Sequence, residues 1–308
     1  MEKDFLYKNR SFSSCLNTAY EWFCDNFRTI FRATWLPVLL YSIFGGFSII
    51  CTLRDARVEA FAEKSPGLFL TLFCLANIGV LVFSVWAWGR FFSLLNGMTC
   101  KKNIIRLLII LLCDIVIGCI IGAFIVGGVW LLTRHKEITP MAFIADNWLI
   151  CLICFIVIML LSLPFSYAGA RYMMKTDATY LPDLPKTYPT GLRHLGFIFI
   201  TTLITGIIIG IIGLVVFMPQ TILMMAQIIS ALGVQFGDPS GMPSYFIPLH
   251  GVTTALTSAL FFYLTVYTML VTVFMYSSIE KEEEERHTNL ISEEEEELTD
   301  NDKPFKTF

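Results

Sequence analysis

The sequence predicts an all-α membrane protein with six transmembrane helices arranged as three hairpins. Of its 308 residues, 56% are hydrophobic and only 15% are charged, whereas a soluble domain carries about 25% charge. Apolar residues gather in blocks of about twenty or more, the length that a helix needs to cross the hydrocarbon core of a bilayer. No block alternates polar and apolar positions as the strands of a membrane β-barrel do.

The six predicted crossings belong to one transmembrane domain, residues 33–279. They run approximately over Ala33–Leu53, Gly67–Gly89, Leu107–Leu132, Trp148–Ala170, Leu195–Met218 and Gly251–Ile279. Basic segments precede the odd-numbered crossings, and an aromatic residue with a charged neighbour follows the even-numbered ones, which suggests three related hairpins. Gly118 with Gly122, and Gly206 with Gly210, have a spacing typical of helix packing. Such flanks and spacings also recur in unrelated helical bundles.

Residues 1–32 predict a cytoplasmic segment that contains an amphipathic helix. Its charged residues do not fit the short basic start of a cleavable signal peptide, so we expect it to be retained. From Ser11 onward, apolar residues recur at steps of three and four, on one helical face. These are Phe12, Leu16, Ala19, Phe23, Phe27, Ile30 and Phe31. We expect an interfacial anchor for the first crossing, with a docking surface for a partner as the alternative.

The distribution of basic residues predicts that both termini are cytoplasmic. The N-terminal segment, the second and fourth connections and the C-terminal segment hold 17 of the 22 Lys and Arg residues. Positive residues near helix ends stay inside. The segment 280–308 has twelve acidic residues against four basic ones, and we expect it to be a disordered tail. A solubilising role is favoured over binding of divalent cations or of a basic partner.

The fifth connection, residues 219–250, is expected to be the largest external loop. Its first part, 221–236, is apolar enough for a short crossing, but Pro219 would break or kink any continuation of the preceding helix. Three glutamines would also form a polar stripe on it: Gln220, Gln227 and Gln235. We therefore expect a helix that lies at the interface or partly re-enters the membrane.

The later part of this loop contains three residues that form a candidate external site. They are Asp238, Tyr245 and His250. Long loops often carry function, so a lid or a receptor site for an apolar ligand or partner is one hypothesis. A cap over the outer end of the bundle is the other.

Asp114 and Asn77 form the candidate intramembrane polar site. Asp114 lies about two turns beyond Arg106, and a carboxylate at that depth costs several kcal/mol unless it is neutralised, paired or hydrated. We predict that Asp114 faces the bundle interior, where it is protonated, pairs with a group such as Asn77, or lines a wet cavity. An interhelical hydrogen bond that only fixes packing is the alternative.

Pro164 lies late in the fourth crossing and predicts a kink there. The hydroxyls of Ser162 and Ser166 are able to satisfy the carbonyls that the proline frees. A fixed structural kink is the expected role, and a gating hinge is the alternative.

The sequence offers no motif for catalysis, metal or cofactor binding. The predicted topology puts two of the four histidines on each side of the membrane, so one chain cannot form a site with three of them. Cys151 and Cys154 have the CxxC spacing but no second pair or nearby histidine. Nine cysteines, mostly within crossings, argue against a disulfide framework. We expect no enzymatic activity, metal or cofactor, and no nucleic-acid partner.

The run from Ser11 to Pro37, SFSSCLNTAYEWFCDNFRTIFRATWLP, resembles the entry to the first helix in bacterial YciC-like proteins. These are similar to the membrane domain found beside glycerophosphodiester phosphodiesterases. The resemblance covers about the first forty residues and the six-helix hairpin pattern. It implies a bacterial inner-membrane protein, and it carries over no catalytic residue because the phosphodiesterase domain has no counterpart in this chain.

These features predict a non-enzymatic inner-membrane protein that supports a partner protein or handles lipid. The expected partners are the lipid bilayer and another membrane protein or a lipid. The alternative is a transporter of a small or amphiphilic solute that uses polar residues near the membrane midplane. A water-accessible path to Asp114 or Asn77 would favour the transporter.

Overall fold

The computed structural model describes residues 3–53, 55–133, 148–237 and 242–301, and the secondary structure in these ranges is helical throughout. Six helices are long and apolar enough to cross a membrane, which confirms the predicted class of multi-pass helical protein. They are α2 (Phe12–Thr52), α4 (Pro66–Asn96), α5 (Cys100–Thr133), α7 (Trp148–Met174), α9 (Leu195–Gln235) and α10 (Phe246–Asn301).

Three shorter helices lie between or before them: α1 (Lys3–Leu6), α3 (Ala56–Lys64) and α8 (Tyr180–Arg193). Helix α8 is not among the elements predicted from the sequence. Pro185 and Pro189 lie inside this helix, although proline opposes helix formation. It is stabilised by burial of one face, which includes Tyr180 and Gly191.

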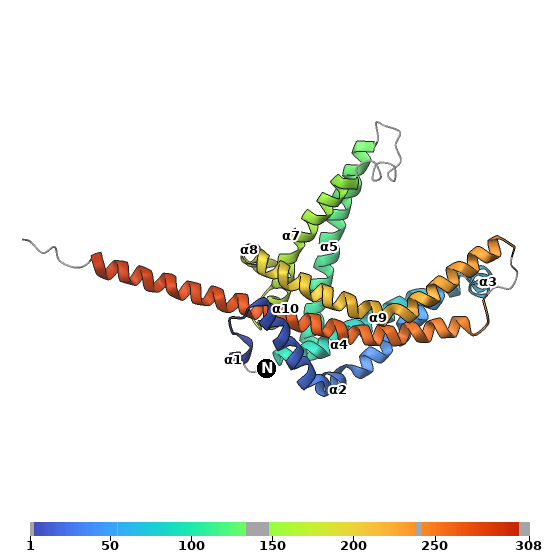
Figure 1. Cartoon of the computed structure of the whole chain (residues 1–308), viewed down its shortest axis with the longest axis horizontal. Helices are drawn as coiled ribbons and strands as arrows, with labels where there is room; N and C mark the ends of the chain where they lie inside the picture. The colour runs from blue at the N-terminus through green and yellow to red at the C-terminus, as the bar shows by residue number, and fades with distance from the viewer. Residues whose placement is uncertain (1–2, 54, 134–147, 238–241, 302–308) are drawn as a thin grey trace, which may run out of the picture.

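Helix α2 joins the predicted surface helix and the first crossing into one helix of 41 residues, about 62 Å at 1.5 Å per residue. Figure 1 shows that it bends, and Pro37 lies inside it. The first part packs on α10, with Cys15 and Ala19 fully buried in the core. Protein thus covers part of the apolar face assigned to the membrane surface, while Phe12, Phe27 and Phe31 stay more than 40% exposed. The interfacial anchor stays a prediction.

Helix α9 also differs from the prediction, since it continues through Pro219 to Gln235. Helix α9 bends (Figure 1) and does not end at the proline, because apolar helix-forming residues follow it. The predicted separate interfacial helix over 221–236 is therefore the second half of α9.

The start of the acidic tail, predicted to be disordered, is helical in the structure. Helix α10 continues past Ile279 to Asn301. A helix that is already nucleated extends at low cost, and glutamate is a good helix former. Residues 302–308 of the predicted tail lie outside the described residues.

Helices α2, α4, α9 and α10 pack together, and we call them the body. Its core surrounds α10, where Val266, Leu270 and Phe274 are fully buried. Gly46 of α2 and Gly251 of α10 touch through their backbones, since a Cβ atom at Gly46 would lie 2.4 Å from the Gly251 carbonyl oxygen. Only glycine permits such an approach.

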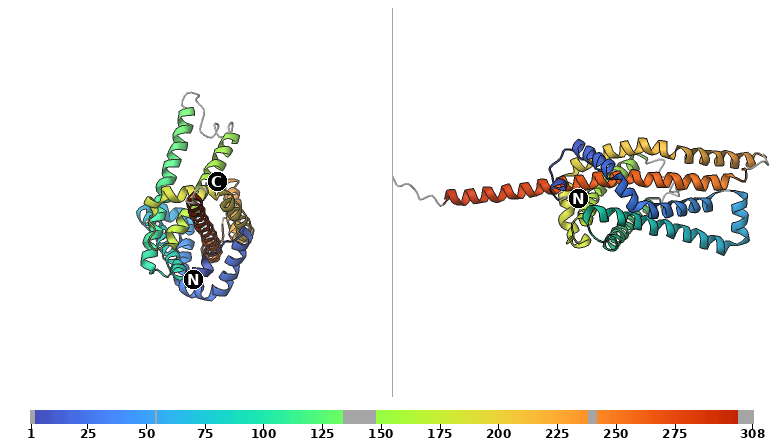
Figure 2. Two further views of the ribbon diagram at one scale, coloured as in Figure 1. Left: turned by 90° about the vertical axis from the view of Figure 1, so that its left-hand side faces the viewer. Right: turned by 90° about the horizontal axis from the view of Figure 1, so that it is seen from below.

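The α5/α7 hairpin leaves the body at a steep angle (Figures 1 and 2). A Cβ atom added at Gly118 or Gly122 of α5 would meet nothing within 4 Å, and the same holds for Gly206 and Gly210 of α9. The predicted packing role of these glycine pairs is therefore wrong for this arrangement. The three hairpins are also not equivalent, because only the second diverges.

Polar contacts attach the α5/α7 hairpin near α8, where α4 and α7 end and α5 and α9 begin; we call this region the α8 end. Arg106 of α5 is buried and donates to the carbonyls of Tyr172, Lys175 and Thr176, at 2.5, 2.8 and 2.6 Å. These carbonyls lie at and after the C-terminus of α7, where a cation is favoured by the helix dipole. Asn96 donates to the Met173 carbonyl at 2.9 Å.

Candidate functional site

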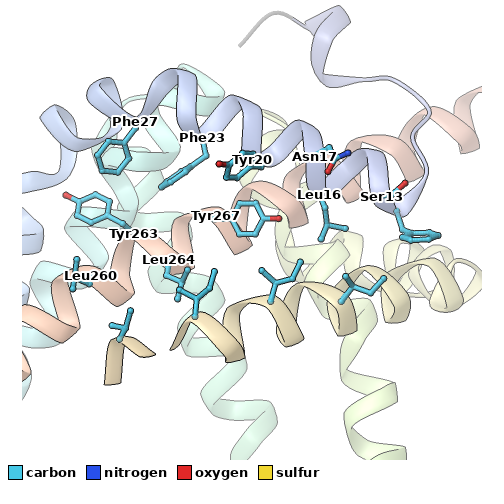
Figure 3. Close-up of a pocket in the computed structure, with 15 residues that line it drawn as sticks. Ser13, Leu16, Asn17, Tyr20, Phe23, Phe27, Leu260, Tyr263, Leu264 and Tyr267 are labelled. Carbon is cyan, nitrogen blue, oxygen red and sulfur yellow. The ribbon is translucent and has the colours of Figure 1, made fainter. Parts of the chain in front are cut away.

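A groove of about 670 Å³ runs between the first part of α2, the middle of α9 and α10. Figure 3 shows α2 along one side, with Tyr263 and Tyr267 of α10 facing it. The lining residues are Phe12, Ser13, Leu16, Asn17, Tyr20, Phe23, Phe27, Ile204, Ile208, Ile212, Val216, Leu260, Tyr263, Leu264 and Tyr267. Most of this surface is hydrocarbon or aromatic ring.

The spacing of the α9 residues explains the apolar wall. Ile204, Ile208, Ile212 and Val216 recur every four residues and therefore share one helical face. The opposite wall contains aromatic rings in contact: the ring centroids of Phe23 and Phe27 are 5.4 Å apart. The groove therefore presents branched aliphatic groups on one side and flat rings on the other.

A ring contact between α2 and α10 lies at one end of the groove. The ring centroids of Phe27 and Tyr263 are 5.8 Å apart, and so are those of Phe31 and Tyr263. The Tyr263 hydroxyl lies 3.4 Å from the Thr34 hydroxyl, so its polar group already has a partner. Two further polar residues of the lining, Ser13 and Asn17, lie toward the other end (Figure 3).

A polar pocket of about 520 Å³ adjoins the groove at the α8 end, and Phe12 lines both. Arg10, Arg193, His194 and Glu282 contribute its charged and titratable groups. The Arg193 side chain pairs with Glu283 at 3.1 Å but keeps 54% of its surface exposed. An apolar groove with a polar, cation-bearing mouth suits a molecule that has one apolar and one charged end.

The start of the acidic run on α10 pairs with bases within the chain. Glu283 accepts from His194 Nε2 at 2.8 Å as well as from Arg193. Glu280 pairs with Lys175 and accepts a hydrogen bond from the Tyr167 hydroxyl at 3.1 Å. This first part of the run therefore binds α7 and the connection around α8, beyond the solubilising role expected from the sequence.

The segment before α2 is hydrogen-bonded to α10. The backbone N–H of Arg10 donates to the Ser278 hydroxyl at 2.9 Å, and that hydroxyl donates to the Arg10 carbonyl at 3.0 Å. The Arg10 guanidinium donates to the Leu6 carbonyl at 2.8 Å and lies 5.1 Å from the centre of the Phe274 ring. The start of α2, and with it the mouth of the groove, is held in place by these contacts.

The structure gives Asp114 and Asn77 different surroundings. Asn77 accepts from Ser48 at 3.3 Å and donates to the Phe73 carbonyl at 2.8 Å, and its side chain is exposed. Asp114 is exposed too and lines a separate cavity of about 280 Å³. No hydrogen bond joins the two in the part of the chain that the structure describes.

Pro164 is buried against α8, where a Cβ atom at Gly191 would lie 2.9 Å from the proline Cβ. Ser162 and Ser166 donate to the carbonyls of Met159 and Leu163, each at 2.7 Å. The carbonyl of Leu161, one turn before the proline, accepts instead from the Tyr188 hydroxyl of α8 at 2.9 Å. This packing favours a fixed kink over a hinge.

The candidate external residues do not gather into one site. Asp238 lies outside the described residues, and Tyr245 is 65% exposed in the turn before α10. His250 is fully buried within α10, where its Nδ1 lies 3.3 Å from Nε2 of Gln220 on α9. The expectation that His250 belongs to an external loop is therefore wrong, because α10 begins at Phe246.

Within the described ranges, no group of three His, Cys, Asp or Glu side chains is arranged to hold a metal ion. The nine cysteines are free thiols. No family model matches the sequence, and no curated protein or solved structure is significantly similar to it. The function must therefore be argued from the groove and the polar groups around it.

Sequence reasoning missed the residues at the mouth of the groove. Arg10, Arg193 and Glu283 were visible only as members of charged segments. The spacing of Glu280 and Glu283 would put both on one face of a continued helix. This spacing indicates a shared contact surface only if the tail is helical.

Proposed function

We propose that this protein is a non-enzymatic membrane protein that binds a phospholipid, with one acyl chain in the groove between α2, α9 and α10. The groove itself is the observation that carries the proposal. Its volume, about 670 Å³, falls in the usual range for small-molecule pockets, about 300–1,000 Å³. Its lining is apolar over most of its length and polar at one end, as an acyl chain below a headgroup requires.

The length of the groove supports an acyl chain as its occupant. The α2 residues that line it run from Phe12 to Phe27, about 22 Å at 1.5 Å per residue. One leaflet is half of a hydrocarbon core of about 30 Å, so an extended chain can lie along the groove. Branched and aromatic side chains also give dispersion contacts that fluid lipid tails do not provide.

The charges at the mouth favour a phospholipid over an uncharged lipid. The half-exposed guanidinium of Arg193 lines the adjoining polar pocket, and guanidinium groups recognise phosphate well. His194 lies in the same pocket. Under the proposed orientation, the headgroup belongs to the cytoplasmic leaflet, where anionic lipids attract basic residues.

The competing hypothesis, solute transport, has less support. It requires Asp114 or Asn77 to line a wet path through the body, and the two residues have separate surroundings. Asn77 forms its hydrogen bonds with Ser48 and with its own helix. We therefore favour lipid binding.

Two matched substitutions on α9 test the proposal. Ile208 lines the groove, whereas Ile211 on the same helix is 61% exposed and lies outside it. Ile208→Trp should fill the groove and abolish retention of bound phospholipid, measured by native mass spectrometry of protein purified in mild detergent. Ile211→Trp should retain the same lipid as the parent.

A phospholipid with a photoreactive diazirine in its acyl chain gives a second measurement. Crosslinked peptides should come from the groove-lining parts of α2, α9 and α10, and Ile208→Trp should remove them. Equal lipid retention by the two tryptophan variants, or crosslinks spread evenly over all six long helices, would show that the groove holds only bulk lipid.

The orientation that underlies the proposal is tested separately by labelling single cysteines. Tyr245 and His287 are both exposed and lie on opposite sides of the predicted membrane. In a background without exposed native thiols, an impermeant maleimide should label Tyr245→Cys in intact cells and leave His287→Cys unlabelled until the cells are opened. The reverse pattern would place the groove mouth on the outside.

A further inference from the structure

A second cavity, about 280 Å³ in volume, lies between α4, α5, α7, α8 and α10, and Asp114 contributes its charged group. Asp114 is eight residues beyond Arg106, about 12 Å along α5. In the described part of the chain, Asp114 has no hydrogen bond and no ion pair. A carboxylate in this position is costly unless a partner neutralises it.

Two bases of the neighbouring segments already have other partners. Arg106 donates to three carbonyls at the end of α7, and Lys175 pairs with Glu280. The described lining of the cavity contains no basic side chain. Among the residues that the structure describes, no basic side chain therefore pairs with Asp114.

The remaining lining suits a cation. Phe92, Phe165 and Tyr180 supply aromatic rings, whose faces attract positive charge. The hydroxyls of Ser166 and Thr272 donate to carbonyls of their own helices, at 2.7 and 3.0 Å, which leaves their oxygens as acceptors. The cavity thus offers one negative charge, aromatic rings and hydrogen-bond acceptors.

Tyr180 lies at the α8 side of the cavity, where the negative charge of Asp114 affects its pKa. Its pKa is raised to about 12, first by burial and then by the negative charge of Asp114. The phenol therefore stays neutral at physiological pH and adds no second negative charge to the cavity. Because Asp114 is exposed in the isolated chain, a ligand has access to it.

We propose that this cavity binds a hydrophobic cation, an amine or quaternary ammonium group with apolar substituents, and that Asp114 is its counter-ion. The rings of Phe92 and Phe165 contact the substituents. The proposal is independent of phospholipid binding in the groove, since the two cavities share no lining residue.

The test is a binding titration of the purified full chain in nanodiscs with benzyltrimethylammonium. Neopentylbenzene, its uncharged isostere, serves as the ligand control. The parent should bind the cation at least about tenfold more tightly than the isostere, and Asp114→Asn should lose about tenfold in affinity for the cation. Asp25→Asn, the same change at an exposed position of α2, should bind like the parent.

A steric variant keeps the charge and removes the space. Gly169 lines the cavity, and a Cβ atom there would meet nothing within 4 Å, so Gly169→Leu should fill the cavity without a clash and prevent binding. Equal affinity of the parent and Asp114→Asn for the cation would overturn the proposal. So would equal affinity of the parent for the cation and the isostere, a comparison that holds even if a variant fails to fold.

Discussion

The body and the α5/α7 hairpin are similarly apolar, yet protein covers them to different extents. In the body, helices approach through glycines and bury a continuous core around α10. The hairpin projects with many large side chains exposed, including Leu112 at 65% and Phe124 at 78%. It is attached near the α8 end, where polar contacts occur beside buried apolar clusters that include Tyr167 and Met173 of α7. Apolarity selects the membrane, but it does not select a neighbouring helix, because lipid tails are equally apolar.

The largest expected effect contrasts one glycine from each region. Gly46→Ala should destabilise the protein by about 3 kcal/mol, because its Cβ would overlap the Gly251 carbonyl and force α2 and α10 apart. Gly118→Ala should change stability by less than about 0.5 kcal/mol, because nothing lies near it. Unfolding by dodecyl sulfate in mixed micelles measures both, and equal effects would remove the distinction between the regions.

Arg106→Ala should be the most damaging change to the attachment of the hairpin. It leaves three carbonyls at the α8 end without their donor, at a cost of about 2 kcal/mol. Spin labels at Ile109 and Met269 should show a broader distance distribution in this variant. Arg90→Ala, at an exposed position, is the control, and an unchanged distribution in Arg106→Ala would mean that other contacts hold the hairpin.

The kink of α7 gives a smaller effect. Tyr188→Phe removes the hydrogen bond to the Leu161 carbonyl and should cost about 1 kcal/mol in thermal unfolding. Tyr245→Phe, at an exposed hydroxyl, should cost nothing measurable. If Pro164→Ala abolishes phospholipid or cation binding while stability is unchanged, the proline acts as a hinge and not as a fixed kink.

The smallest effect concerns the start of α8. Asp183 accepts from the Thr179 N–H at 2.7 Å, and this hydrogen bond holds the pKa of Asp183 below its usual value. The stability that this hydrogen bond contributes is therefore present at pH values above the usual carboxyl pKa. It is lost as the pH falls through the lowered pKa of Asp183. Hydrogen exchange at the Thr179 amide should accelerate in Asp183→Asn at neutral pH. Unchanged exchange would show that burial of Tyr180 alone fixes this helix.

The sequence alone determined the class of the protein and the positions of its six long apolar helices. Hydrophobic length is a local property, so it can be read without a fold. The sequence also identified Asp114 as a carboxylate that needs an explanation, because the cost of burying charge in a membrane does not depend on the fold.

Tertiary structure decided how these helices continue, bend and meet. Pro219 predicted a break or a kink, and only the structure shows that α9 continues through it as one helix. The glycine pairs of α5 and α9 predicted contacts, but the close approach occurs at Gly46 and Gly251. His250 is buried because α9 and α10 pack together. Arg193 lies at the mouth of the groove because the start of α2 and the later part of α10, distant in sequence, meet beside it. Such contacts depend on the relative placement of whole helices, which hydrophobic pattern leaves undetermined because lipid and protein satisfy an apolar face equally well.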